Sequence, residues 1–253
     1  MQVSTPIVET ELFQHPYPQF SSIQANPARA LCLFETLGWI PTEADARAFL
    51  GCRTIQEIMD RLLLDTSPVR HLFLSGTSEG LGNLREFYTA LLLEAQWTPR
   101  PGYDVRKIFE IRSGLKIGKV EVRGCRPNTK GPRWRVRISD SQGDLTSDVI
   151  VIVCMKESYD PCFADLFAIP SQALENVISE IRSRRESKGI SPKDPRVKIR
   201  IYKERIDSYK NSINKWWEYW VPDHSELKMI VTSYIEGDFK PIPKQLSFGN
   251  IPR

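Results

Sequence analysis

Lysine is missing from the first 106 of the 253 residues, and several features that would identify a protein class are missing from the whole chain. No apolar run approaches the roughly 18 residues of a membrane span, so no membrane partner is expected. The N-terminus lacks a basic stretch followed by an apolar core, which argues against a secretory signal. The 5 cysteines are scattered and form no CxxC pair. These absences predict a cytoplasmic protein with reduced thiols.

Sequence motifs of the common cofactor-dependent enzymes are absent as well. The chain contains no GxxxxGK[ST], GxGxxG or GxSxG, so nucleotide hydrolysis, dinucleotide chemistry and the serine-hydrolase elbow are not expected. The 3 histidines are dispersed and fit no zinc spacing. No nucleotide cofactor and no structural zinc are therefore predicted.

The charge of the chain is unevenly distributed. Residues 1–65 hold 4 arginines against 8 acids, whereas residues 112–137 hold 9 basic residues against 1 acid. Residues 182–215 hold 12 basic residues against 4 acids. Two basic segments behind an acidic front indicate either a polyanion partner or solvated basic faces.

The N-terminal third is expected to be an extended arm followed by a small helical part. Residues 1–25 are rich in proline and polar residues, and residues 26–75 show helical periodicity. Helices are predicted from Asn26-Pro27 to about residue 37, over 42–50, and over 54–64. Thr54 and Glu57 have the spacing of a capping box. A Gly/Ser-rich break is expected over 75–83.

The second and third of these helices have the order of a helix-turn-helix. The second helix of the pair, however, carries Glu57, Asp60 and Asp65 with Arg61 as its one basic residue. An acidic recognition helix repels phosphate. The alternative, a packing part without a DNA-reading role, therefore suits these residues better.

The remainder predicts a mixed α/β domain over residues 80–239. An amphipathic helix is expected over 84–96, followed by strands over 103–111, 119–124, 133–139, 148–155, 165–169 and 197–203. Helices are expected over 172–186, capped by Ser171, and over 206–220. Residues 240–253 are expected to be a loose tail. Helices interspersed with strands predict a mixed sheet flanked by helices.

Two carboxylates on neighbouring strands are the candidates for chemistry. Asp104 precedes Glu121 by 17 residues, and the alternation of Lys119-Val-Glu121-Val-Arg123 puts its three charged residues on one strand face. Carboxylate oxygens suit Mg²⁺, and a nearby cation can orient a water for attack on a phosphodiester. The alternatives are that Asp104 is a turn residue and that Glu121 forms a charge pair with its neighbours on an edge strand.

The order of these elements resembles the PD-(D/E)XK, or restriction-endonuclease-like, nuclease superfamily. Glu86 in its helix, Asp104 after Pro-Gly-Tyr, and Glu121-Val-Arg123 look like the three motif elements over residues 80–170. The downstream strands that contain Arg133-Trp134, Asp148 and Ile169-Pro170 also look like members of the family. The resemblance implies a restriction-endonuclease-like fold, Mg²⁺ held by Asp104 and Glu121, and DNA as substrate. It further implies Glu86, Lys119 and Arg123 as assisting residues, and it allows a homodimer.

One departure from the family pattern bears on activity, because the motif lysine is Arg123 in this chain. Arginine stays protonated, so water orientation and charge stabilisation are open to it but proton abstraction is not. Lys119 lies on the same strand face and is the alternative cation. Three interpretations follow: an active DNA endonuclease, a catalytically degenerate DNA-binding protein of the same fold, and a protein-interaction module.

Basic residues after Glu121 predict the nucleic-acid contact. Three arginines alternate along 133–139, and two more basic residues precede them in a turn, giving the set Arg126, Lys130, Arg133, Arg135 and Arg137. Phosphate contacts of this kind give affinity without reading sequence. Trp216, Trp217 and Trp220 are expected in the core, with base stacking as the alternative.

Overall fold

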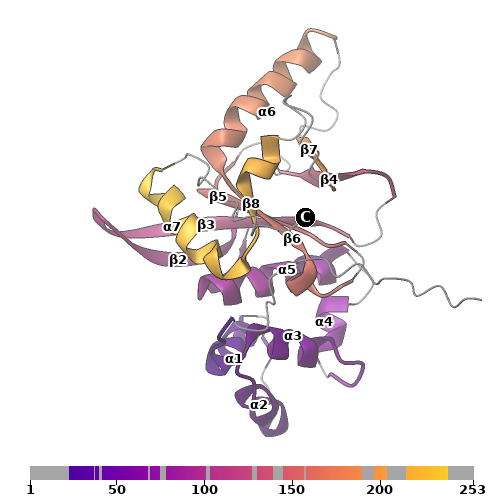
Figure 1. The fold of residues 1–253 in the computed structure, drawn as a ribbon, viewed down its shortest axis with the longest axis vertical. Coiled ribbons are helices and arrows are strands. Elements are labelled where there is room, and N and C mark those ends of the chain that lie inside the picture. Colours follow the sequence, from indigo (N-terminus) through magenta and orange to yellow (C-terminus); the bar gives the residue numbers. More distant parts are fainter. Residues whose placement is uncertain are drawn as a thin grey trace, which may run out of the picture.

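The structure is a computed structural model that describes residues 23–238, apart from 37, 40–41, 68, 75–77, 101–102, 127–129, 139–144, 157, 190–196 and 204–214. Its architecture is a mixed sheet with helices on both faces (Figure 1). The predicted α/β class is therefore confirmed. The predicted arm, apart from its last residues, and the predicted tail over 240–253 lie outside the described residues.

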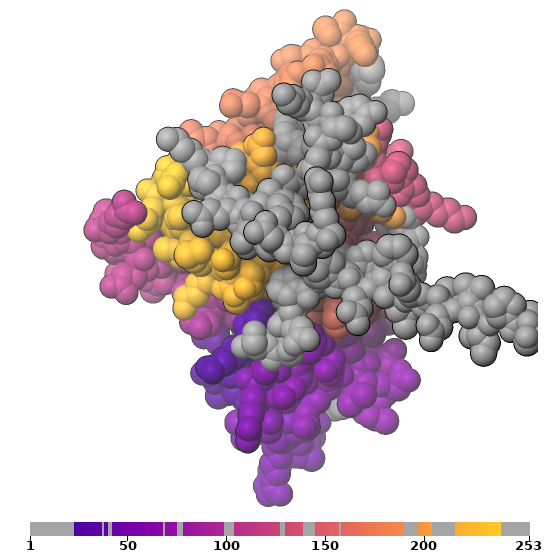
Figure 2. Space-filling model, viewed as in Figure 1, coloured from indigo at the N-terminus to yellow at the C-terminus, as the bar shows by residue number. Residues whose placement is uncertain are grey.

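Four helices form the N-terminal end of the molecule, the lower end in Figures 1 and 2. They are α1 (Pro27–Glu35), α2 (Glu43–Leu50), α3 (Ile55–Leu63) and α4 (Arg70–Leu74). Asn26 caps α1, and both Thr42 with Asp45 and Thr54 with Glu57 form capping boxes, since each threonine accepts from a backbone N–H. The predictions for the first three helices are thus confirmed, including the cap at Thr54.

Helix α3 gives its apolar face to the core. Ile58, Met59 and Leu62 on this helix are fully buried, and the acidic residues Glu57 and Asp60 lie on its exposed side. The surface that α3 leaves to solvent is therefore acidic, which favours the packing role over DNA reading.

Helix α5 (Ser78–Leu93) lies along one face of the sheet and begins earlier than predicted. The expected break over 75–83 is helical from Ser78 onward, although it contains Gly80 and Gly82. Gly80 is buried, and tertiary packing outweighs the low helix propensity of glycine at such positions. The predicted C-terminal end of the helix was also wrong, because residues from Gln96 belong to a strand.

The central sheet has the strand order β1-β2-β3-β5-β6-β8. Its strands are β1 (Gln96–Arg100), β2 (Tyr103–Ile111), β3 (Gly114–Cys125), β5 (Val149–Cys154), β6 (Asp165–Pro170) and β8 (Trp220–Val221). All neighbours are antiparallel except β3 and β5, which run parallel from Val120↔Val149 to Cys125↔Cys154. β5 and β6 are buried at every residue, as expected of strands covered on both faces.

A second, two-stranded sheet pairs β4 (Arg133–Arg137) with β7 (Lys198–Tyr202). Helix α6 (Ser171–Glu186) follows β6 directly, and helix α7 (Leu227–Glu236) follows β8 (Figure 1). Ser171 is the first residue of α6 and not its cap. The predicted helix over 206–220 was wrong where it can be judged, since Lys215–Tyr219 is a 3-10 helix and Trp220 starts β8. Residues 206–214 of that prediction lie outside the described residues.

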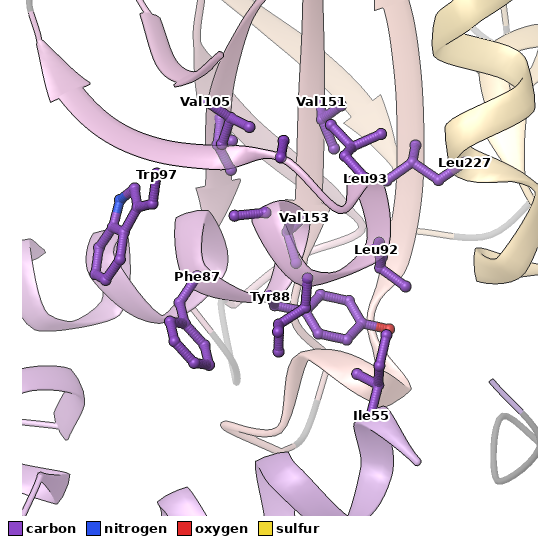
Figure 3. Close-up of a cluster of buried hydrophobic side chains, with 14 of the residues drawn as sticks. Ile55, Phe87, Tyr88, Leu92, Leu93, Trp97, Val105, Val151, Val153 and Leu227 are labelled. Carbon is purple, nitrogen blue, oxygen red and sulfur yellow. The ribbon is translucent and has the colours of Figure 1, made fainter. Parts of the chain in front are cut away.

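Two hydrophobic cores cover the two faces of the sheet. Val151 and Val153 of β5 point into the first core, with α5, α7 and the N-terminal helices (Figure 3). Ile150, Ile152 and Cys154 point into the second core, with α6, β4 and β7. Trp216 and Trp217 lie in this second core, as predicted. No helix in the described residues is long and apolar enough to cross a membrane.

The N-terminal helices and the sheet share the first core, so they should unfold together. Phe34 of α1 is fully buried, and its ring centroid lies 4.8 Å from that of Phe87 on α5. Phe34→Ala should lower the free energy of unfolding by about 3–5 kcal/mol, in one transition seen alike by far-UV circular dichroism and tryptophan fluorescence during urea denaturation.

The matched control is Leu50→Ala on α2, where the side chain is 57% exposed. This variant should change stability by less than about 0.5 kcal/mol. Two separate transitions, or a loss in Phe34→Ala no larger than in the control, would contradict a shared core.

Candidate active site and nucleic-acid interface

The candidate site lies at the beginning of β2, where its pairing with β3 stops. Paired residues of β2 and β3 extend as far as Val105↔Val120, whereas β3 goes on to pair with β5 up to Cys125. The edge of β3 that faces β2 is therefore open to side chains beyond Val120. Asp104 and Glu121, the next residue on each strand, flank this opening.

The Asp104 side chain takes the place of a backbone hydrogen-bond acceptor beside β3. Its Oδ2 accepts a hydrogen bond from the Val122 N–H at 2.7 Å, and the side chain is buried. Burial raises the pKa of Asp104 to about 6, although the Val122 hydrogen bond and the Arg123 charge oppose the shift.

Glu86 reaches the same opening from helix α5. The Trp97 indole on β1 donates from Nε1 to Glu86 Oε2 at 2.8 Å. Burial, with the Asp104 charge adding to it, raises the pKa of Glu86 to about 7. The Trp97 hydrogen bond and the charges of Arg123 and Arg85 oppose this shift. The Asp104 carboxylate is thus close enough to act on the ionisation of Glu86.

Glu121 and Arg123 are neighbours on one face of β3. Their side chains form an ion pair between Oε1 and Nη2, and Glu121 is 4% exposed. The charge of the same guanidinium opposes the upward pKa shifts of Glu86 and Asp104. Arg123 is thus the cation that three acids share.

The structure brings together four of the five predicted site residues: Glu86, Asp104, Glu121 and Arg123. Lys119, two residues before Glu121 on β3, is exposed, and its backbone N–H donates to Asp148. Trp97, which orients Glu86, was missed because residues 84–96 were predicted to be helical up to its neighbour. An indole after an amphipathic helix gave no sequence signal of a hydrogen bond to an acid 11 residues earlier.

The donor atoms at the opening suit a hard cation. Asp104 and Glu121 offer carboxylate oxygens, and Mg²⁺ is commonly held by one or two carboxylates with water in its remaining positions. Across the described ranges, no three acid, histidine or cysteine side chains are placed to hold one ion together. A magnesium ion at Asp104 and Glu121 would therefore take two protein carboxylates from the described residues and water in its remaining positions.

The predicted basic residues lie on the two-stranded sheet. Arg133, Arg135 and Arg137 are exposed on one face of β4, while Trp134 and Val136 point into the second core. The chain around β4 reaches the molecular surface (pink in Figure 2). Strand β7 adds two exposed basic residues that the predicted contact set lacked, Lys198 and Arg200.

These basic side chains face one another across the strands. Arg135 pairs with Arg200, and Arg137 with Lys198. Like charges directly opposite destabilise a sheet by roughly 0.2–1 kcal/mol per pair. No carboxylate among the described residues forms an ion pair with Arg135 or Arg200. A surface built this way gains stability when a polyanion binds it.

A cavity of about 770 Å³ lies between the end of β3 and this basic surface. It begins at Gly124 and Cys125, directly after Arg123, and Arg135 and Arg200 line its other side. Arg126 and Lys130 also line it, and Arg126 donates to Ser78 Oγ at the start of α5 at 2.7 Å. Part of the turn between Arg126 and Lys130 lies outside the described residues.

Comparison of the chain with protein-family models, with curated proteins and with solved structures finds no match. The site must therefore be interpreted from its own residues.

The raised pKa of Glu86 predicts a pH-dependent gain in stability on its replacement. The folded protein holds the Glu86 proton up to about pH 7, whereas an unfolded chain releases it near the ordinary value of 4.5. The unfolding free energy therefore falls as pH rises from about 4.5 to 7 and stays reduced above. Glu86→Gln, which still accepts from Trp97, should gain about 1–3 kcal/mol at pH 8 and almost nothing at pH 4, by urea denaturation.

The matched control is Glu79→Gln, an exposed acid in the first turn of the same helix. It should show no such pH-dependent gain. Equal stability of Glu86→Gln and the unaltered chain at pH 8 would show that the Glu86 carboxylate is not held at a cost.

Proposed function

We propose that this chain is a Mg²⁺-dependent DNA endonuclease with a restriction-endonuclease-like, or PD-(D/E)XK, site. The observation that carries the proposal is the convergence of Glu86, Asp104 and Glu121 on Arg123. These acids come from α5, β2 and β3, and they are separated in sequence by 18 and 17 residues. Acids without a function are expected at the solvated surface, because burial of each carboxylate costs free energy of folding.

The four side chains suggest distinct roles. Asp104 and Glu121 would hold a magnesium ion, which supplies Lewis-acid polarisation of the scissile phosphodiester. A guanidinium does not act as a base, so Arg123 would orient the attacking water and stabilise charge on the phosphate. Glu86, whose pKa is raised to about 7, can exchange a proton near neutral pH.

The basic sheet supplies the binding energy in this proposal. Arg133, Arg135 and Arg137, with Arg200 and Lys198, would contact phosphates of the duplex beside the acid cluster. Such contacts give affinity that falls with salt and carries little sequence information. The cavity that begins at Gly124, one residue after Arg123, is lined by Arg133, Arg135 and Arg200 and would take part of the bound strand.

One observation favours a second candidate, a DNA-binding protein of the same architecture that does not cut. Arg123 forms an ion pair with Glu121, one of the two carboxylates proposed for the metal. A guanidinium cannot be deprotonated to release that carboxylate. In this candidate the basic sheet binds DNA and the acids serve only to hold Arg123.

A cleavage assay separates the two candidates. The unaltered chain should nick supercoiled plasmid with Mg²⁺ or Mn²⁺ and not with EDTA. Glu121→Gln should lower the rate by roughly 100-fold or more, because it removes a stabilising charge from the reacting centre. Arg123→Lys, which can be neutral, should keep or raise the rate.

Glu110→Gln on β2 is the matched control, because Glu110 is exposed and opposite Leu115. It should cut like the unaltered chain. Binding of DNA without cleavage by the unaltered chain under any divalent ion would reject the endonuclease in favour of the second candidate.

Replacement of the facing arginines should separate DNA affinity from stability. Arg135→Ala with Arg200→Ala removes a repulsive pair, so the melting temperature should hold or rise. The same change should weaken DNA binding and flatten the slope of log affinity against log salt by about 1 for each phosphate that the variant no longer binds. Fluorescence anisotropy with labelled duplex DNA over a salt series gives both quantities.

Arg106→Ala on β2 is the control, since Arg106 is an exposed arginine outside the basic sheet. Its affinity and salt slope should match those of the unaltered chain. Equal losses of affinity in the control and in the double variant would mean that net charge, and not this surface, attracts DNA.

A further inference from the structure

Two cysteines lie side by side on the only parallel strand pair of the described sheets. Cys125 on β3 and Cys154 on β5 are Cα partners in the register. Adjacent strands lie about 4.8 Å apart, which is within the 4.4–6.8 Å or so between Cα atoms that a disulfide spans. Both side chains belong to the second core and so leave the sheet on the same face.

Both thiols are buried, but they differ in access to the cavity. Cys125 lines the cavity at the end of β3, and its Sγ lies 3.7 Å from the carbonyl oxygen of Arg135. Cys154 is fully buried. A small oxidant in the cavity would therefore meet Cys125 first, with Cys154 directly behind it.

The pKa values of the two thiols also favour Cys125 as the reactive one. A hydrogen bond from the Cys154 thiol lowers the pKa of Cys125 below its ordinary value, and the Arg85 charge acts in the same direction against burial. Burial holds the pKa of Cys154 well above its ordinary value. Cys125 is the more readily ionised thiol, and thiolates are the reactive form.

Arg85 is a buried cation that the acid cluster alone does not explain. It is 8% exposed, and its Nε has no hydrogen-bond partner among the described residues. Gly124 gives it room, because a Cβ there would lie 2.6 Å from Arg85 Cδ and 2.3 Å from the Val153 carbonyl oxygen. The chain thus holds a guanidinium against the end of β3, next to the thiols.

We propose that Cys125 and Cys154 form a reversible dithiol–disulfide pair that responds to hydrogen peroxide. The Cys125 thiolate attacks a peroxide oxygen, the O–O bond breaks, and the leaving hydroxide takes a proton to become water. The Cys154 sulfur then attacks the Cys125 sulfenic acid, the S–O bond breaks, and a second water leaves. Two thiols lose two electrons in total, and the peroxide is reduced to two waters.

The other cysteines lack this arrangement. Cys52 and Cys162 are buried, and burial raises the pKa of each thiol. Cys32 is exposed on α1. None of these three pairs in register with another cysteine in the described sheets. The proposal uses neither DNA nor the acids, so it stands or falls independently of the proposed function.

The test oxidises the full-length reduced chain with hydrogen peroxide at low stoichiometry. Free thiols are then alkylated under denaturing conditions, and intact and peptide masses are measured. The expected result is the loss of two hydrogen masses, a linked Cys125–Cys154 peptide, and reversal by dithiothreitol. In Cys154→Ala, oxidation should stop at a sulfenic acid on Cys125 that dimedone traps, whereas Cys32→Ser should still form the linked peptide.

Arg85→Gln tests the role assigned to the guanidinium. It should slow alkylation of Cys125 in the folded reduced protein by roughly three- to tenfold at pH 7, with circular dichroism reporting the fold. If the Cys154 variant does not fold, the linked peptide in the unaltered chain decides alone. Cys125 that stays reduced, goes on to sulfinic acid while Cys154 remains free, or pairs with another cysteine would overturn the proposal.

Discussion

The parallel pairing of β3 with β5 is the constraint on which the rest of the structure depends. It joins the β1–β2–β3 meander to the β5–β6–β8 part of the sheet. Because side chains alternate along these strands, one pairing sends Val120, Val122 and Val151 to the first core and Ile150 and Ile152 to the second. A slip of one residue would exchange the two sets. The register of β2 with β3, in which Val105 lies opposite Val120, sets Asp104 beside Glu121.

The electrostatics of the opening follow from this geometry. Glu86 and Asp104 are held where burial disfavours their charged forms, and Arg123 offsets part of that cost. Folding alone would be served better by apolar residues there. Groups held at a cost in stability are often functional. The buried acid cluster is therefore a stronger indication of a functional site than the sequence pattern Glu121-Val-Arg123. Two polar groups lie between the cluster and the cavity. Cys125 is two residues after Arg123 on β3, and Arg85 of α5 lies against Gly124.

The basic sheet shows the same conflict between stability and arrangement. Strands β4 and β7 are separated by about 60 residues of sequence, yet their register sets Arg135 against Arg200 and Arg137 against Lys198. Trp134 and Ile201 on the opposite face anchor the pair in the second core. Apolar packing on one face therefore stabilises a repulsive arrangement on the other, and a bound polyanion would relieve it.

The sequence by itself determined the local elements whose signals are local. The caps at Asn26, Thr42 and Thr54, the bounds of β2 and the fully apolar β5 could be predicted because each depends on residues a few positions apart. The start of α5, strand β1 and helix α7 were missed, because packing against the sheet decides them over propensity. Only the tertiary structure decided that Trp97 orients Glu86, that Arg123 is shared by three acids, and that Cys125 lies beside Cys154. Apart from Glu121 with Arg123, those relations join residues 11 to 37 positions apart. Register and burial, which no local pattern encodes, bring them together.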